Sequence, residues 1–405
     1  MARTIVDLIL GIVTSIGGFV EAGSISTAAQ AGSEFGFQLL WAVAAATAML
    51  AMLVEMSGRL AAVSKRSVAA AVRERFGVHF QFVPLTAELL LDVLLLAAEI
   101  GGVALALTLL TGVGFQVWVL PIGFMVWLVL WCCGFSTIEY GMGLLGLVTL
   151  SFVVSAWQLG PPAAALGAGL IPSMPSHEPL RYGFLTVSIL GATVSPHLLN
   201  FYSSGTVEEK MKERELWVNR VTAYVGICFG GVVSMAILVT SAMVLGPQHI
   251  IVESYDQAAL MFVPTFGRWA VGLFAAALGV GCFGAALEVA LNAGYVSAQV
   301  FGWSWGANKP RRDTARFVSA FTLILVASTL VAVIGFDPLR LTSISLALTV
   351  IIMPAVVLPF LVLMNDDRYV KTHKSGPVGN VVLAALTILG AILAIVVVPL
   401  QILGG

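Results

Sequence analysis

Glu21 is the residue in the first hydrophobic run that could do chemistry, because it places a carboxylate where lipid would otherwise surround it. The glycines Gly17, Gly18 and Gly23 lie close to it, and each weakens a helix by about 1 kcal/mol relative to alanine. Ionisable groups in membrane helices are rare unless they face a cavity or a partner. Ser24 adds a hydroxyl about one turn later. We therefore predict a break in this helix that exposes oxygen ligands.

A second break is predicted near Ser195, where Pro196 interrupts another apolar run. Proline has no N–H group and its ring clashes with the preceding turn. Carbonyls such as that of Ala192 then lose their helical partners. Two interrupted hydrophobic helices, one opening each half of a membrane chain, indicate a transporter site near the bilayer midplane.

Together the two breaks would form an oxygen-rich site with one formal negative charge. The candidate ligands are the carboxylate of Glu21, the hydroxyls of Ser24 and Ser195, and the carbonyl of Ala192. These ligands suit a hard cation such as Mg²⁺, Ca²⁺ or Mn²⁺ and offer nothing soft for Cu(I) or zinc. The alternative is that Glu21 only lines a polar crevice and that the Ser195 hydroxyl bonds to its own backbone.

The composition assigns the chain to the polytopic all-α membrane proteins, with the lipid bilayer as partner and no nucleic acid. Of its 405 residues 59% are hydrophobic and 10% charged, and its mean hydropathy is +1.00. Soluble proteins carry about 25% charged residues. We expect no enzyme, because zinc-protease, nucleophile-elbow and P-loop motifs are absent from the sequence. The four cysteines lie in apolar runs and are predicted to be small buried residues.

Spanning a bilayer takes about 20 apolar residues, which divides the chain into eleven predicted helices. Their expected ranges are 4–32, 36–60, 84–110, 115–133, 140–159, 181–204, 218–245, 269–302, 317–335, 341–364 and 378–403. The connection 160–179 is rich in Pro and Gly and is too polar and broken to span.

The distribution of basic residues orients these helices. A cytoplasmic N-terminus places 17 of the 20 Lys and Arg residues on the cytoplasmic side and leaves Arg181, Arg268 and Arg340 outside. This is the bias of the positive-inside rule. With eleven helices the C-terminus is then external. We expect a multi-pass protein of a bacterial cytoplasmic (inner) membrane.

The broken helices are the first and the sixth, so they divide the chain into two repeats of five helices. The first repeat would cover 1–159, the second 181–364, and an additional helix 378–403. Since five is odd, the second repeat starts on the opposite side and is inverted. We expect a single transmembrane domain that functions as a monomer.

Residues 18–41 resemble the first helix and the following loop of the Nramp metal-ion transporters. That family has Asp-Pro-Gly-Asn there, followed by Gln-Ala-Gly and Leu-Leu-Trp; this chain has Glu21-Ala-Gly-Ser24, Gln30-Ala-Gly and Leu39-Leu-Trp41. Residues 191–204, which begin Gly-Ala-Thr-Val-Ser-Pro-His, resemble the family's sixth helix. Residues 73–76 and 99–107 also resemble family stretches. The likeness runs in order through about the tenth helix and implies a LeuT-like fold with alternating access.

This resemblance places Glu21 at the family's metal-binding aspartate and Ser24 at its asparagine. Ala192 stands at the backbone-carbonyl ligand, and Ser195 replaces the methionine whose soft thioether favours transition metals. The sequence therefore favours Mg²⁺ first and Mn²⁺ second, as in Nramp-related magnesium transporters that also lack the methionine. The ion would be cargo, and no cofactor is expected. A same-fold transporter of a non-metal solute, such as an organic amine or an anion, is the alternative.

The proton relay implied by the resemblance is incomplete. Family members carry an Asp three residues before a Glu in the third helix; Glu99 is present, but Leu96 occupies the Asp position. His197 matches the first histidine of the sixth helix, and Tyr202 replaces the second. A relay needs a chain of titratable groups. We therefore expect movement that is weakly coupled to protons or not coupled at all.

Four residues are candidates for a proton path or for gating: Glu99, His197, Glu288 and Asp92. His197 could equally be a hydrogen-bonded structural histidine, and Glu288 a packing contact to another helix. Asp92 lies seven residues before Glu99 and therefore shares a helix face with it. Glu55 and Arg59 are four residues apart and are predicted to pair with each other.

Overall fold

The computed structural model describes residues 21–404 except 174 and 176. All regular structure within these residues is helical, and ten helical segments are long and apolar enough to cross a membrane. The remaining predicted span is the first in chain order, and its part from 4 to 20 lies outside the described residues. The all-helical multi-pass fold is thus confirmed, whereas the count of eleven spans stays a prediction.

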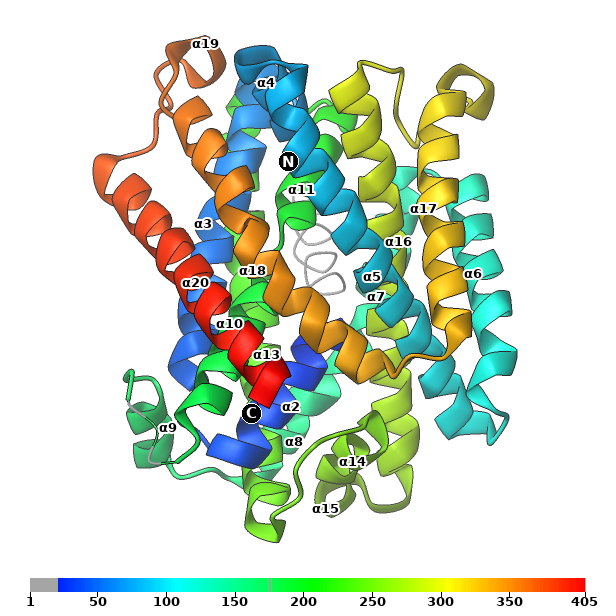
Figure 1. Ribbon diagram of the computed structural model, residues 1–405, viewed down its shortest axis with the longest axis vertical. Helices are drawn as coiled ribbons and strands as arrows, with labels where there is room; N and C mark the ends of the chain where they lie inside the picture. Colours follow the sequence, from blue (N-terminus) through cyan, green and yellow to red (C-terminus); the bar gives the residue numbers. More distant parts are fainter. Residues whose placement is uncertain (1–20, 174, 176, 405) are drawn as a thin grey trace.

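The helices follow the order expected from the sequence (Figure 1). They are α2 (Ala22–Phe35), α3 (Leu40–Ser64), α4 (Val68–Phe76), α5 (Val78–Thr111), α6 (Phe115–Cys132), α7 (Phe135–Gly146), α8 (Leu150–Leu159), α9 (Ala163–Gly169), α10 (Pro179–Thr193), α11 (Pro196–Glu208), α12 (Leu216–Val221), α13 (Ile227–Val244), α14 (Tyr255–Ala259), α15 (Val263–Phe266), α16 (Ala270–Phe301), α17 (Ala315–Ile334), α18 (Pro338–Leu363), α19 (Asp367–Val370) and α20 (Pro377–Gly404). The largest difference from expectation is at α5, which begins at Val78 and contains Pro84 within its first two turns.

The sixth predicted helix consists of two half-helices, α10 and α11. Val194 and Ser195 between them have extended backbones, and Pro196 is the first residue of α11. Proline is favoured at that position because its missing N–H has no helical partner there. The described part of the first predicted helix, α2, likewise begins directly after an extended residue, Glu21, with φ −118° and ψ 177°.

The two ends of the bundle differ in their charge. Figure 1 places α4 and α19 at one end, and α9, α14 and α15 at the other. The first end, here called the basic end, carries Lys65, Arg66, Arg73, Arg75, Arg368, Lys371 and Lys374. The other end is called the α14 end.

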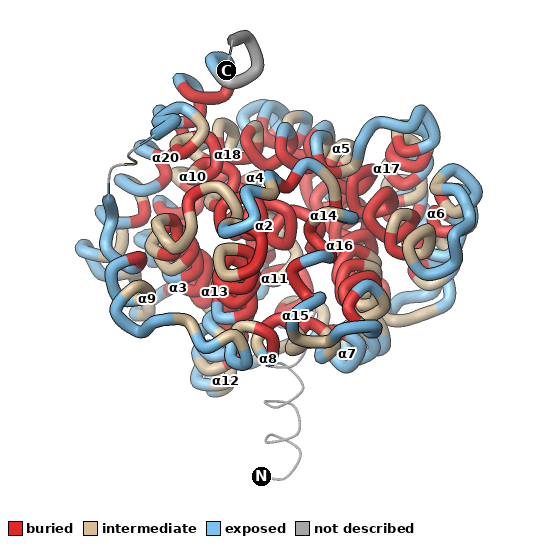
Figure 2. The backbone as a smooth tube through the Cα atoms, turned by 90° about the horizontal axis from the view of Figure 1, so that it is seen from below, coloured by how far each residue is buried: buried red, intermediate tan, exposed pale blue. Residues whose placement is uncertain are grey.

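The half-helices lie in the interior of the bundle. Figure 2 shows α2, α11 and α16 surrounded by other helices, with α6 and α20 at the periphery. Helix α5 packs along α16, α2 packs on α13, and α10 contacts both α2 and α18. The breaks are thus enclosed by α5, α16 and α18.

The prediction that all four cysteines are buried is wrong for three of them. Cys282 is buried, but Cys132 and Cys228 are exposed and Cys133 is intermediate. The reason is that helix faces toward lipid are as apolar as faces toward the protein core, so an apolar sequence context does not distinguish the two.

Candidate functional site

The start of α2, which stands at the predicted first break and is called by that name here, is held by hydrogen bonds between Glu21 and Ser24. The Glu21 N–H donates to Ser24 Oγ at 2.9 Å, and that hydroxyl donates to the Glu21 carbonyl at 3.0 Å. The Glu21 side chain is buried, and its Oε1 has no hydrogen-bond partner within the described part of the chain. A buried carboxylate oxygen without a donor is costly. The break therefore presents an acceptor that a cation could satisfy.

Side chains from two other helices fix Ala22, the first residue of α2. Its N–H donates to Glu99 Oε2 of α5 at 3.3 Å, and its carbonyl accepts from the hydroxyl of Tyr255 in α14 at 3.0 Å. Glu99 is fully buried, and its second oxygen, Oε1, also lacks a partner within the described residues. The third-helix glutamate thus supports the first break directly.

The second break presents a backbone carbonyl and no charged side chain as a candidate ligand. Ser195 Oγ donates to the carbonyl of Gly191 at 2.9 Å, so this hydroxyl is engaged by its own helix. Pro196 has no N–H, and the Ala192 carbonyl therefore lacks the donor that would normally stand four residues later. Of the two candidate oxygens at this break, the carbonyl is the one left without a helical partner.

Helix α18 brings the two breaks to one place. A Cβ added to Gly23 would lie 2.9 Å from Cδ1 of Leu346, and a Cβ added to Gly191 would collide with the Leu346 carbonyl. Both half-helices therefore approach Leu346 of α18, and at Gly191, which faces the Leu346 backbone, the approach is so close that only glycine fits. The absence of a side chain at Gly191 is required by this close approach, whatever the ligand.

Cys282 lies near the first break, which the sequence did not indicate. Its sulfur occupies the space where a Cβ on Gly102 of α5 would lie, and the Cβ of Ala22 is 3.8 Å from that same point. Gly102 is three residues after Glu99, so the thiol of α16 packs beside the glutamate that holds Ala22. The only sequence signal was a cysteine within a run of small residues.

The remaining predicted residues lie nearer the basic end. Asp92 precedes Glu99 by seven residues, about 10 Å along α5. His197 is the second residue of α11 and is buried. Glu288 of α16 is half-buried and lines a cavity of about 50 Å³ together with Glu139.

Glu139 also borders a larger cavity at the basic end. This cavity measures about 450 Å³, and residues of α7, α11 and the segment 215–222 line it. Its wall includes the carboxylates of Glu139, Glu209 and Glu215. Acidic walls of this kind raise the local concentration of cations.

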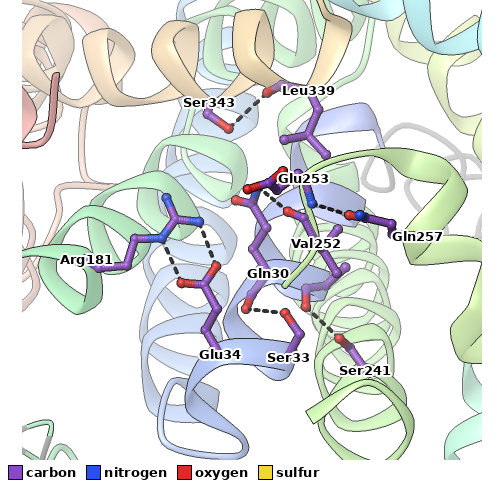
Figure 3. A network of polar contacts seen from close by, with 11 residues as sticks. Gln30, Ser33, Glu34, Arg181, Ser241, Val252, Glu253, Gln257, Leu339 and Ser343 are labelled. Carbon is purple, nitrogen blue, oxygen red and sulfur yellow. Dashed lines mark hydrogen bonds and ion pairs between the residues drawn. The ribbon is translucent and has the colours of Figure 1, made fainter. Parts of the chain in front are cut away.

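A network of polar contacts joins α2 to its neighbours toward the α14 end (Figure 3). Arg181 of α10 makes two hydrogen bonds, of 2.8 and 2.7 Å, to the carboxylate of Glu34 in α2. Gln30 Nε2 donates to the carbonyl of Val252, in the segment before α14, at 3.1 Å, and Ser241 of α13 donates to the Ala29 carbonyl. These contacts tie α2 to α10, to α13 and to the segment before α14.

Two other acids of the bundle have basic partners. The predicted pair of Glu55 and Arg59 is confirmed, at 3.1 Å, and Glu34 is paired with Arg181. Glu21 and Glu99 take part in none of the ion pairs found among the described residues. Within those residues, no group of three or more His, Cys, Asp or Glu side chains could hold a metal ion by side chains alone. A cation at the breaks would therefore also need backbone oxygens or water.

The family described as natural resistance-associated macrophage protein-like, Nramp, matches residues 11–399. The chain belongs to the Nramp family. This membership agrees with the resemblance of the two broken segments and with the all-helical LeuT-like fold, and it is a family of transporters rather than of enzymes.

Solved structures show the same fold for this Nramp chain. A manganese transporter of Eremococcus coleocola, in complex with an aromatic bis-isothiourea substituted compound, is 18% identical, with 98% of this chain and 86% of that chain covered and a TM-score of 0.79. A Na⁺-coupled sialic acid symporter in a substrate-bound outward-open state is 12% identical, with coverage of 95% and 88% and a TM-score of 0.63. Mhp1, a nucleobase-cation-symport-1 family transporter, is 16% identical, with coverage of 96% and 92% and a TM-score of 0.58.

Proposed function

We propose that this Nramp-family protein is a secondary transporter of a hard divalent cation, with Mg²⁺ as the first cargo and Mn²⁺ as the second. The observation that carries the proposal is the unpartnered, buried Oε1 of Glu21 at the start of a half-helix. Family membership and the fold shared with a manganese transporter support a divalent metal as cargo.

In this proposal Glu21 neutralises the cation and the Ala192 carbonyl completes the opposite side. Ser24 keeps Glu21 in its extended conformation through the two hydrogen bonds that they share. The Ser195 hydroxyl becomes a ligand only if it rotates away from Gly191. Water fills the other positions, which suits Mg²⁺ because that ion parts reluctantly with its hydration shell.

The preference for Mg²⁺ rests on the type of ligand at the second break. Ser195 removes the thioether that the resembling family members offer there and leaves the Ala192 carbonyl as the oxygen of this break, and hard cations prefer oxygen. Cys282 is the soft atom near the first break, but its sulfur packs against Gly102 and beside Glu99, the residue that holds Ala22. We therefore place Mn²⁺ behind Mg²⁺ and expect both to bind.

We further propose that transport is driven by the cation gradient, with little or no proton coupling. Leu96 stands where the resemblance expects the second acid of the third helix. Glu99 binds the backbone of Ala22 and so has a role in holding the break that needs no proton transfer.

The basic end would face the cytoplasm, as the positive-inside rule predicts, which puts the N-terminus inside and the C-terminus outside. The ion pair of Arg181 and Glu34 at the α14 end and the acidic cavity at the basic end support, in this orientation, a state that is closed to the outside. We place the protein in a bacterial inner membrane as a monomer.

Uptake into liposomes that contain the purified protein tests this function. We expect Mg²⁺ and, more weakly, Mn²⁺ to enter, Glu21→Ala to abolish entry, and a pH-sensitive dye inside to report no acidification. Glu55→Gln serves as a matched control, since it also changes a buried acid. If correctly inserted wild-type protein moves neither ion, the metal proposal fails, and amines or anions become the cargo to test.

A further inference from the structure

A second group of buried polar side chains lies between the helix breaks and the basic end. It joins α5, α11 and α16 and is here called the inner cluster. Its members are Glu88, Asp92, Asn200 and Asn292. The exposed fractions of these side chains lie between 0% and 3%, so the cluster is shielded from solvent as completely as the hydrophobic core.

Glu88 is the centre of the inner cluster. Asn200 Nδ2 donates to both of its oxygens, at 2.9 and 3.0 Å, and Asn292 Nδ2 donates to Oε1 at 3.1 Å. An ionised carboxylate only accepts hydrogen bonds, so three donated bonds fit the charged form. The donors are neutral amides and leave the charge itself without compensation.

Asp92 adds a second carboxyl group one turn away on the same face of α5. It lies within electrostatic range of Glu88 and beside Asn292. Neither acid belongs to an ion pair within the part of the chain that the structure describes. Two neighbouring carboxylates in a membrane interior are costly unless a cation neutralises them or they share a proton.

The unpartnered oxygens of the inner cluster distinguish between a bound cation and a shared proton. Asp92 Oδ2, Asn200 Oδ1 and Asn292 Oδ1 are all buried and have no hydrogen-bond partner among the described residues. One shared proton would satisfy only one of them. A hard cation binds several oxygens at once, from carboxylates and carboxamides alike.

The chain directions place this cluster on the route from the breaks to the basic end. Asn200 follows Ser195 by five residues, about 8 Å along α11, and Glu88 precedes Glu99 by 11 residues, about 16 Å along α5. Asn292 follows Glu288 by four residues on α16 and thus lies on the same face. Helices α11 and α16 run toward the basic end and α5 runs away from it, and all three place their cluster residues at the same level of the bundle.

We propose that the inner cluster is a second cation site, which takes a hard divalent cation after it leaves the helix breaks. The site rests on the proposed transport function for its place in the route, but its chemistry does not depend on the first site. It explains why an asparagine pair and two acids meet inside a membrane bundle, where apolar residues would pack at lower cost.

Counting bound Mn²⁺ tests the second site. The free aquo ion gives an electron paramagnetic resonance signal that is lost on binding, so titration of purified protein yields the number of ions per chain. We expect two for the wild type, one for Asp92→Asn, one for Glu21→Ala, and none for the double variant. Glu55→Gln, which changes an acid paired with Arg59, should retain two.

Glu88→Gln and Asn200→Ala provide second variants in case Asp92→Asn does not fold, and only monodisperse preparations are counted. If these variants lose one ion while Glu21→Ala binds as many as the wild type, the inner site is supported and the site at the breaks is refuted. A wild type that binds one ion, lost in Glu21→Ala and retained in all inner-cluster variants, would overturn the second site.

Discussion

The two helix breaks both leave backbone groups without helical hydrogen-bond partners, but different residues surround these groups. At the first, a buried carboxylate stands at the start of α2, and the backbone around it is tied by Ser24, Glu99 and Tyr255. At the second, Pro196 interrupts the helical hydrogen bonds, and the nearby hydroxyl of Ser195 donates to the carbonyl of Gly191. The first break thus presents a carboxylate whose backbone is held by neighbouring side chains, and the second presents an uncharged backbone carbonyl.

Under the proposed function, this difference would separate the charge of the site from its selectivity between cations. In the proposed site, the charge that attracts a cation would come from Glu21, whereas the discrimination between hard and soft cations would depend on whether position 195 supplies a thioether. Changes at the first break should therefore alter how much cation binds, and changes at the second should alter which cation binds.

The largest effect is expected for Glu21→Ala. Removing one partner of a buried charge interaction costs about 3 kcal/mol or more, which corresponds to roughly 100-fold weaker binding. Cation uptake into liposomes should fall to the level of empty vesicles, while Glu55→Gln retains uptake. Uptake by Glu21→Ala within a few-fold of wild type would show that the charge at the first break is not used.

Ser195→Met should change selectivity instead. A thioether beside the Ala192 carbonyl favours softer divalent ions, and a gain of about 1.4 kcal/mol shifts the Mn²⁺ to Mg²⁺ preference roughly tenfold. Competition between the two ions in the uptake assay measures this ratio. Ser195→Leu controls for size without sulfur, and an equal shift in both variants would assign the effect to volume.

Ser24→Ala should have a smaller effect, mainly on stability. Its hydroxyl accepts from the Glu21 N–H, as a capping side chain does, and such bonds contribute about 1 kcal/mol. We expect a lower thermal midpoint and a modest decrease in cation affinity, with selectivity unchanged. A changed Mn²⁺ to Mg²⁺ ratio would mean that Ser24 is itself a ligand.

The smallest effect is expected for Ser195→Ala. The hydroxyl bonds to the carbonyl four residues earlier, a contact that contributes little to helix stability. Uptake of Mg²⁺ should stay within about twofold of wild type, since a net hydrogen bond of about 0.5 kcal/mol is at stake. A much larger loss would show that the Ser195 hydroxyl rotates to bind the cargo.

The sequence predicted the membrane helices well because their length and apolar character are set by the bilayer itself. It also located the second break, since proline has a specific backbone effect at Pro196. The first break was predicted from glycines at 17 and 18, which lie outside the described residues, and from Glu21, which the structure shows in an extended conformation.

The contacts that define the site could not be predicted in the same way. Glu88, Asn200 and Asn292 come from three helices, and only their packing shows that they meet. The engagement of the Ser195 hydroxyl depends on its rotamer, which the sequence left as one of two alternatives. The position of Cys282 beside Gly102 likewise follows from how closely α16 approaches α5.

The most direct test of the central claim is the position of a bound cation in crystals soaked with Mn²⁺, located by its anomalous scattering. We expect a peak between the two breaks, within coordination distance of Glu21 Oε1 and facing the Ala192 carbonyl, and no such peak in Glu21→Ala crystals. Density for Mn²⁺ elsewhere, with the space between the breaks empty at a saturating concentration, would contradict it.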